Sequence, residues 1–480
     1  MFHDINLSKA VPLVVDLDGS LTSADIAVES LFRCLAGKVS GRARMIGHLP
    51  GGTAAIKTWL ARVDPVDPRS LPLREEVLDL IARARAEGRP VILASAAHQR
   101  QVDRVADHLR LFDHAIGTTS ARSNNKGANK LARIRSLIGD APFDYVGDSS
   151  ADLPIWREAR IAYTVGVTTR AANEQRLVPG TRNSPTALAR AARPHQWAKN
   201  LLVFVPLVTA GLLTDIDAIA QAVIAFLCMS FLASGTYLLN DLLDIDADRA
   251  HSSKCKRPLA AGELSIPFAL LSAAIAIVGS LAVMMLATGY AGFLALTLYL
   301  VMTLAYSLRL KSAMIVDVIA LAGLYTLRLV VGAAAIGVAV SFWLFLFSTF
   351  FFLSLGYVKR YVELSKSEVD RHALLKGRGY VGSDAEIVMV SGISAGMVSL
   401  LIIALFANDM RTSDIYQTPS LLWLLVVPLL YWLNRIWMMA RRGQVDGDPV
   451  AFAMKDKRSW VLFSSVGAII LAAKFMVSPF

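Results

Sequence analysis

Residues 218–249 read AIAQAVIAFLCMSFLASGTYLLNDLLDIDADR, an apolar run that ends in four aspartates within eight residues. The apolar part, residues 218–239, contains no charged side chain. A helix of about 20 such residues crosses the hydrocarbon core of a bilayer. The sequence therefore predicts a membrane-spanning helix whose end presents a cluster of carboxylates.

Eight further apolar runs occupy the second half of the chain. Together the nine candidate membrane helices lie near 197–213, 218–239, 267–287, 290–306, 314–336, 341–358, 387–407, 420–438 and 460–478. The whole chain is 55% hydrophobic and 18% charged, with a mean hydropathy of +0.49. This composition excludes a disordered or purely soluble protein. We expect an all-α polytopic membrane domain over residues 195–480.

Basic residues fall on one side of the predicted membrane helices. With the N-terminus in the cytoplasm, the cytoplasmic connections hold 18 Lys and Arg, and the opposite connections hold only Arg411. Positive charge marks the cytoplasmic side, so we expect a multi-pass protein of the inner, cytoplasmic membrane with both of its sites in the cytoplasm. The net charge is +11, but in this half the basic residues lie where anionic lipid headgroups supply counter-charge. Nucleic acid is therefore not an expected partner.

The N-terminal half has an ordinary globular composition and alternates strand-like with helical stretches. The strand-like runs are Leu13–Val15, Val91–Ala94, Phe143–Val146 and Ile161–Val165. This alternation predicts an α/β domain with a Rossmann-like parallel sheet over residues 1–180. Residues 25–80 interrupt it with helical, loop-rich sequence, which indicates an inserted helical cap. Residues 181–194 are the expected linker to the membrane domain.

Polar residues stand at the ends of these predicted strands. Asp16 and Asp18 follow the first strand in the segment DLDGSLT, and two acids this close can share a metal ion. Alone, Asp-x-Asp-Gly also occurs in calcium loops and ordinary turns. Later strand and helix ends supply a hydroxyl, an ammonium and two more acids, namely Ser95, Lys126, Asp148 and Asp152. Ligands bind at the carboxyl ends of parallel strands, so the set indicates a phosphate and metal site.

This ordered set resembles the haloacid dehalogenase phosphatase superfamily over roughly residues 10–170. The resemblance implies that Asp16 is a nucleophile that forms an aspartyl-phosphate. It implies that Asp18 is the general acid and base for the leaving alcohol and then for water. The Mg²⁺ ligands that it implies are Asp16, Asp18 and Asp148, with Asp152 as a further ligand or a partner of one.

The same resemblance assigns the phosphate-binding groups. Ser95 and Lys126 would neutralise phosphoryl oxygens. Lys130 lies one helical turn beyond Lys126, and either lysine can be the one that the family's motif requires.

The aspartates that follow residue 239 recur at helical spacing. At about 100° per residue, Asp241, Asp244 and Asp248 fall within roughly 60° of one another on a continuing helix, whereas Asp246 points away. A hydrated helix end is the simplest explanation, but three carboxylates on one face repel unless cations join them. Such a cluster suits Mg²⁺ that bridges to a diphosphate. The basic residues that can complete this anion site are Lys254, Lys256 and Arg257.

The segment from Asn240 to Asp248, set among nine helices, resembles the UbiA-type polyprenyltransferase superfamily over nearly all of residues 190–480. Three further segments are similar to its decaprenyl-phosphate phosphoribosyltransferase branch: 193–200, 306–311 and 359–364. The resemblance implies phosphoribosyl diphosphate as the donor and a polyprenyl phosphate lipid as the acceptor. It also implies Mg²⁺ on the three aspartates, with Asn240 in the same site.

The segment after the sixth predicted helix departs from the pattern of aromatic prenyltransferases, which usually carry a second aspartate-rich motif there. This chain has Lys359, Arg360, Glu363, Glu368 and Asp370 instead. A more cationic site suits a substrate with an extra phosphate. The candidate phosphate contacts are Lys199, Arg257, Tyr306, Lys311, Lys359 and Arg360. Arg328 lies inside the fifth predicted helix, where an unpaired guanidinium is costly, and both structural pairing and ligand contact remain open for it.

The fusion of two such halves suggests one hypothesis. The membrane half makes polyprenylphosphoryl 5-phosphoribose, and the soluble half removes its 5-phosphate. The principal alternative is transfer of a polyprenyl group from its diphosphate to an aromatic or other acceptor. A transporter or scaffold is a third class, but it leaves the metal-type spacing of acids in both halves unexplained. The oligomeric state stays open, a homo-oligomer included.

Overall fold

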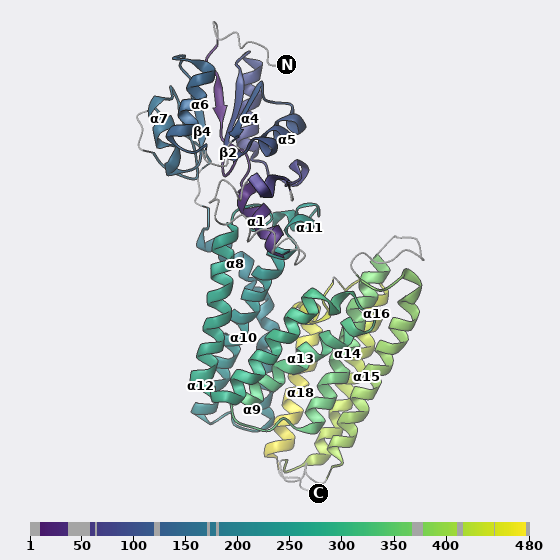
Figure 1. Cartoon of the computed structure of the whole chain (residues 1–480). Helices are drawn as coiled ribbons and strands as arrows, with labels where there is room; N and C mark the ends of the chain where they lie inside the picture. The colour runs from purple at the N-terminus through teal and green to yellow at the C-terminus, as the bar shows by residue number, and fades with distance from the viewer. Residues whose placement is uncertain are drawn as a thin grey trace. The chain divides into compact units, whose positions relative to one another are not determined.

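The computed structural model of the chain describes residues 10–36, 58–62, 65–119, 125–169, 173–178, 182–366, 378–409, 416–445 and 447–476 (Figure 1). The chain divides into two compact units. The first unit joins Met1–Ala192 to Tyr237–Ser272, and the second joins Arg193–Thr236 to Ala273–Phe480. The acidic segment that follows residue 239 therefore belongs to the same compact unit as the N-terminal domain.

The first unit is built on a six-stranded parallel sheet in the order β3-β2-β1-β4-β5-β6. Its strands are β1 (Leu13–Val15), β2 (Val91–His98), β3 (His114–Thr118), β4 (Asp144–Gly147), β5 (Ala162–Val165) and β6 (Glu174–Val178). The order runs outward in both directions from β1 and β4, so the carboxyl ends of these two strands flank the switch point where such sheets bind ligands. The predicted α/β fold is confirmed, and β3 and β6 are additions to the four predicted strands.

Helices cover both faces of this sheet (Figure 1). On one face α4 (Glu75–Ala86) and α5 (Gln99–Leu109) bury apolar side chains against β1 and β2. On the other face α6 (Ala128–Ile138) and α7 (Leu153–Glu158) do the same. Because both faces are covered, every residue of the short strands β1 and β4 is buried.

The segment between β1 and α4 contains α1 (Ile26–Ala36) and the 3-10 helix η2 (Pro68–Ser70). The predicted cap over residues 25–80 covers this segment, but residues 37–57 and 63–64 lie outside the described residues. Helix α4 begins at Glu75 and packs into the core of the sheet. The last six residues of the predicted cap therefore belong to the sheet domain.

The remainder of the chain is helical, and seven helices among the described residues are long and apolar enough to cross a membrane. They are α10 (Ile216–Leu243), α12 (Ile266–Leu308), α13 (Val316–Ala335), α14 (Phe342–Lys366), α15 (Ala385–Ala407), α16 (Val426–Arg441) with the 3-10 helix η9 (Pro419–Leu425), and α18 (Lys457–Phe475). The chain is therefore a multi-pass membrane protein.

The nine predicted helices map onto these seven with two differences. Helix α12 contains the predicted helices 267–287 and 290–306, and its backbone leaves helical geometry at Gly289. The prediction of a continuous helix over 197–213 is wrong, because these residues form the 3-10 helix η4 (Pro194–Phe204) and the short α9 (Val205–Thr209). Pro206 lies at the start of α9, and a proline has no amide hydrogen to continue the preceding helix.

A close backbone approach positions η4 within the second unit. A Cβ atom at Gly332 of α13 would overlap the backbone carbonyl of Val203 in η4. Only glycine leaves room for the two backbones at this distance. The approach also places Asn200 of η4 beside Arg328 of α13, with 3.1 Å between Arg328 Nε and Asn200 Oδ1.

We predict that Gly332→Ala lowers the stability of the second unit by about 1–3 kcal/mol, because the added methyl group overpacks the η4–α13 contact. Gly323→Ala is the matched control in the same helix, since a Cβ atom there meets nothing within 4 Å. The control should stay within about 1 kcal/mol of the wild type. Thermal unfolding in detergent measures both, and equal midpoints for the two variants would contradict the packing argument.

Candidate active sites

A buried ammonium group lies at the centre of the site in the soluble domain. Lys130 Nζ lies 2.8 Å from Asp16 Oδ1, 3.2 Å from Asp152 Oδ1 and 3.0 Å from the Tyr145 hydroxyl. All four side chains are buried. Lys126 is exposed just before α6, whereas Lys130 lies one turn inside that helix. Of the two candidate lysines, the structure therefore brings Lys130 to the acids.

Three carboxylates gather around this ammonium group. Asp16, Asp148 and Asp152 each offer one oxygen, and these oxygens lie within 4.8 Å of one another. Burial and the neighbouring Asp152 raise the pKa of Asp148 to about 7. Burial also raises the pKa of Asp16, although the Lys130 ammonium acts in the opposite direction. Oxygen ligands in this number and spacing, with carboxylates that repel one another, fit Mg²⁺.

Gly19 makes room for this carboxylate group. Its φ of +79° is in the left-handed region, and a Cβ atom on it would overlap the Asp148 carboxylate. The glycine of the segment DLDGSLT is thus required twice, once for the turn after β1 and once for the approach of the acid that follows β4.

Asp18 lies outside the three-carboxylate group. Its Oδ2 accepts a hydrogen bond from the Ser95 hydroxyl at 2.9 Å, and its Oδ1 accepts one from the Ile26 amide at 2.9 Å. The second contact places Asp18 at the start of α1. Ser95 in turn accepts from the Ala97 amide, so its hydroxyl orientation is fixed by β2.

Two residues of this site were not predicted. Tyr145 on β4 donates from its hydroxyl to Asp152 Oδ1 at 3.0 Å. The Asn125 side chain, which is buried, donates to the Ser95 carbonyl at 2.8 Å. Asn125 stands next to Lys126 in the sequence, but Tyr145 reads as one more apolar strand residue.

The helix that was expected to continue through residues 240–249, the acidic segment, is interrupted at Asp244. Helix α10 ends at Leu243, Asp244 has φ −98° and ψ 11°, and the five-residue α11 (Ile245–Arg249) follows. Asp241 and Asp248 are buried, whereas Asp244 is exposed. Among the described residues, Asp16, Asp148 and Asp152 lie close enough together to hold one metal ion, whereas Asp241, Asp244 and Asp248 do not form such a group.

A single guanidinium joins the two buried acids of this segment. Arg257 Nη1 lies 3.1 Å from Asp241 Oδ1 and 2.6 Å from Asp248 Oδ2. Arg257 follows the 3-10 helix η5 (Lys254–Lys256), and Asn240 is half-buried in the last turn of α10. Arg257, predicted as a phosphate contact, is thus held by these two carboxylates, and a cation fits between them.

In the second unit, Lys199 of η4 lies 2.5 Å from Asp448 Oδ2. The other carboxylate oxygen of Asp448 accepts from two amides at the start of α17 (Pro449–Lys455). Burial acts to raise the pKa of Asp448, but Lys199 and Lys359 outweigh it and the pKa is lowered. Two candidate phosphate contacts, Lys199 and Lys359, therefore act on the same carboxylate.

Arg328 is held by three neutral oxygens. It donates to Asn200 Oδ1 at 3.1 Å, to the Leu324 carbonyl at 2.6 Å and to the Tyr299 hydroxyl at 3.0 Å. Its guanidinium also lies over the rings of Tyr299 and Tyr325. Each of the three guanidinium nitrogens thus donates to one protein oxygen, which keeps the guanidinium in one position.

The predicted phosphate contact Arg360 is part of a buried ion-pair network. It is 1% exposed and pairs with Asp317 and Glu363. Arg378, which was not predicted, lies 3.8 Å from each of these carboxylates. Glu368 and Asp370, which follow in the sequence, lie outside the described residues.

Tyr306 and Lys311 lie at the edge of the same network. Arg378 donates to the Tyr306 hydroxyl at 3.2 Å and to the Lys311 carbonyl at 3.1 Å. Lys311 is in the short 3-10 helix η6 (Leu310–Ser312). The network therefore joins the candidates from two separate sequence segments, but Arg360 itself is committed to carboxylates.

Two family models match the chain. Residues 202–455 match the UbiA prenyltransferase family, and residues 22–157 match haloacid dehalogenase-like hydrolases. The chain belongs to the UbiA prenyltransferase family. It also carries a haloacid dehalogenase-like domain, as the motifs of its N-terminal half indicate.

Relatives of this UbiA-family chain differ in how much of it they share. An uncharacterised protein of Sinorhizobium fredii, y4nM, is 38% identical over 98% of this chain and 91% of its own length. The decaprenyl-phosphate phosphoribosyltransferase of Mycolicibacterium smegmatis is 30% identical over 60% of this chain and 94% of its own. A solved UbiA homolog from Archaeoglobus fulgidus, bound to GPP and Mg²⁺, is 20% identical with a TM-score of 0.44. The match covers 59% of this chain and 99% of the homolog.

We predict that Gly19→Ala lowers Mg²⁺-dependent hydrolysis of p-nitrophenyl phosphate by roughly 100-fold, because the new methyl group displaces the Asp148 carboxylate. Gly88→Ala is the matched control, since Gly88 also has a positive φ (+71°) but nothing lies within 4 Å of a Cβ atom there. Both variants pay a similar backbone penalty of about 1–2 kcal/mol. An equal loss of hydrolysis in both would show that backbone strain, and not the displaced acid, is responsible.

Proposed function

We propose that this chain is a bifunctional membrane enzyme. Its membrane domain transfers 5-phosphoribose from phosphoribosyl diphosphate to a polyprenyl phosphate lipid, and its soluble domain removes the 5-phosphate of the product. The observation that carries the proposal is the ion pair of Lys199 with Asp448 in a UbiA-family chain, with Lys359 near enough to help lower the pKa of the same carboxylate. The similarity to a decaprenyl-phosphate phosphoribosyltransferase supports it.

In the transferase step, Asp241, Asp244 and Asp248 would hold Mg²⁺, and Arg257, which lies on two of these carboxylates, would bind a diphosphate oxygen. Bound Mg²⁺ supplies positive charge to the departing diphosphate. The bond from the anomeric carbon to the diphosphate oxygen breaks, and an oxygen of the polyprenyl phosphate forms the new bond to that carbon. Diphosphate leaves with the electron pair.

The cations of the second unit are the proposed contacts for phosphate groups. Lys199 and Arg328 are held in place by the protein contacts described above, and Lys359 helps to lower the pKa of Asp448. Lys311 and Tyr306 are further candidates beside Arg378. Arg360 is a weaker one, because its guanidinium is engaged by two carboxylates.

In the phosphatase step, Asp16 attacks phosphorus and forms an aspartyl-phosphate while the alcohol leaves. Asp18, held by Ser95 and the Ile26 amide, gives a proton to that alcohol and later takes one from water. Lys130 and Ser95 neutralise the phosphoryl oxygens. Asp16, Asp148 and Asp152 would hold Mg²⁺, which would lower the charge repulsion between the phosphoryl group and the nucleophile.

Both sites are proposed to lie on the cytoplasmic side of the inner membrane. The distribution of Lys and Arg among the connections supports this orientation. The principal alternative, prenyl transfer from a polyprenyl diphosphate to an aromatic acceptor, is favoured by the family model itself. The two reactions differ in which substrate carries the label into lipid, so one assay separates them.

The transferase is tested with purified protein, Mg²⁺, radiolabelled phosphoribosyl diphosphate and polyprenyl phosphate. We predict label in the organic phase for the wild type and a loss of about 100-fold or more for Asp241→Ala. Asp217→Ala is the control, because Asp217 is exposed at the other end of α10. Absence of lipid-linked label from the wild type would refute phosphoribosyl transfer and favour prenyl transfer.

The phosphatase is tested in the same assay. We predict that Asp16→Asn still forms lipid-linked product but accumulates it with its 5-phosphate, because the amide is a poor nucleophile. Asp107→Asn, at an exposed position on α5, should give the dephosphorylated product of the wild type. Unchanged dephosphorylation by Asp16→Asn would remove the soluble domain from this reaction.

A further inference from the structure

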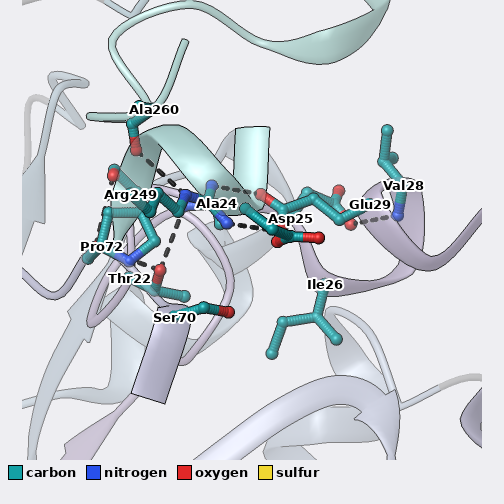
Figure 2. Close-up of polar contacts among 12 residues, drawn as sticks. Thr22, Ala24, Asp25, Ile26, Val28, Glu29, Ser70, Pro72, Arg249 and Ala260 are labelled. Atoms are coloured by element: carbon teal, nitrogen blue, oxygen red, sulfur yellow. Dashed lines mark hydrogen bonds and ion pairs between the residues drawn. The ribbon is translucent and has the colours of Figure 1, made fainter. Parts of the chain in front are cut away.

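A buried ion pair joins the soluble domain to the acidic segment within the first unit. Glu29 of α1 accepts two hydrogen bonds from Arg249, the last residue of α11, at 2.9 and 2.6 Å (Figure 2). The Glu29 side chain is 4% exposed and that of Arg249 is 6% exposed. Two parallel charge-assisted bonds between a guanidinium and a carboxylate fix both the distance and the orientation of the partners.

The loop that follows α11 is held against the same part of the soluble domain. Arg249 Nε donates to the Ala260 carbonyl at 3.1 Å (Figure 2), and the Ser23 hydroxyl donates to the Ala261 carbonyl at 2.7 Å. Gly262 has a φ of +73°, and a Cβ atom on it would overlap Ser23. Ser23 and Glu29 therefore hold the loop that contains Arg257 at its two ends.

Asp246 reaches the same helix. Its Oδ1 lies 2.5 Å from Arg33 Nη2, one turn beyond Glu29 on α1. This pair is more exposed than the first, at 50% for the Asp246 side chain. Its contribution is accordingly smaller, and Glu29 provides the main attachment.

Helix α11 depends on this attachment for its position. A helix of five residues has too few internal hydrogen bonds to be stable alone. Asp248 is the residue before Arg249, so the position of its carboxylate follows from where Glu29 holds that arginine. Groups that fix a metal ligand from behind change metal affinity when they are removed, typically by 10–100-fold.

We propose that Glu29 of the soluble domain is a positioning residue of the transferase site, because it holds Arg249 and thereby sets the Asp248 carboxylate for a Mg²⁺-bound diphosphate. The inference rests on the proposed function of Asp241, Asp244 and Asp248 as the diphosphate site. It assigns to the soluble domain a part in the transfer reaction that is separate from its own hydrolysis.

The test measures binding of inorganic diphosphate in the presence of Mg²⁺ by calorimetry on the full chain. We expect Glu29→Gln to weaken binding roughly tenfold. The KM for phosphoribosyl diphosphate should rise by a similar factor, with kcat changed much less, because the defect is in placement of the acid. Glu263→Gln is the matched control. Glu263 lies in the loop that follows α11, but its ion pair with Arg190 is exposed.

A second variant separates positioning from folding. Glu29→Gln leaves Arg249 buried with its charge unpaired, which can unfold the region, whereas Glu29→Gln/Arg249→Gln leaves no buried charge. Positioning predicts a wild-type unfolding midpoint for this double variant and the same tenfold loss of diphosphate binding. Wild-type binding by the double variant would overturn the proposal, and so would unfolding of both variants, because the pair would then serve folding alone.

The binding readout also separates this proposal from the proposed function. A wild-type protein that binds diphosphate with Mg²⁺ but transfers no phosphoribose would refute the donor, while the comparison with Glu29→Gln would still decide the role of Glu29. A wild-type protein that binds no diphosphate would overturn both.

Discussion

A buried carboxylate needs a cation or several hydrogen bonds, and this constraint organises both units. Lys130 holds Asp16 and Asp152, Arg257 holds Asp241 and Asp248, and Arg360 holds Asp317. In each case the cation comes from a different helix or loop than the acid. The pairs therefore determine which segments must pack together, and a charge removed from one of them leaves its partner buried and unpaired.

The chemistry at the sheet could be predicted because parallel strands end at a common edge. Asp16 and Asp148 follow β1 and β4, and their position in the sequence was enough to bring them together. The choice between Lys126 and Lys130 was not predictable, because only four residues separate an exposed position just before α6 from a buried position in its first turn. Tyr145 was missed since a tyrosine in an apolar strand reads as core.

In the membrane half, the long apolar helices were predictable from the sequence, whereas the places where a helix changes type or ends were less so. Apolar runs located the long helices and the break at Gly289 within α12, but not the change from the 3-10 helix η4 to α9 at Pro206. The argument from a single helical face failed for Asp244, because α10 ends before it. Spacing along an ideal helix is informative only as far as the helix continues, and the contact of Arg257 with two acids is a tertiary fact.

Helix α1 gives the first unit its link between two kinds of chemistry. Its first amide binds Asp18, and Glu29, one turn later, binds Arg249. Both contacts lie in the first turn of this 11-residue helix, so a displacement of α1 would move the partners of Asp18 and of Arg249 together. Linkage between two sites is reciprocal. If a ligand on the acidic segment moves α1 and so changes the affinity of the Lys130 site for phosphate, phosphate bound at that site must change the affinity of the acidic segment for its ligand by the same factor.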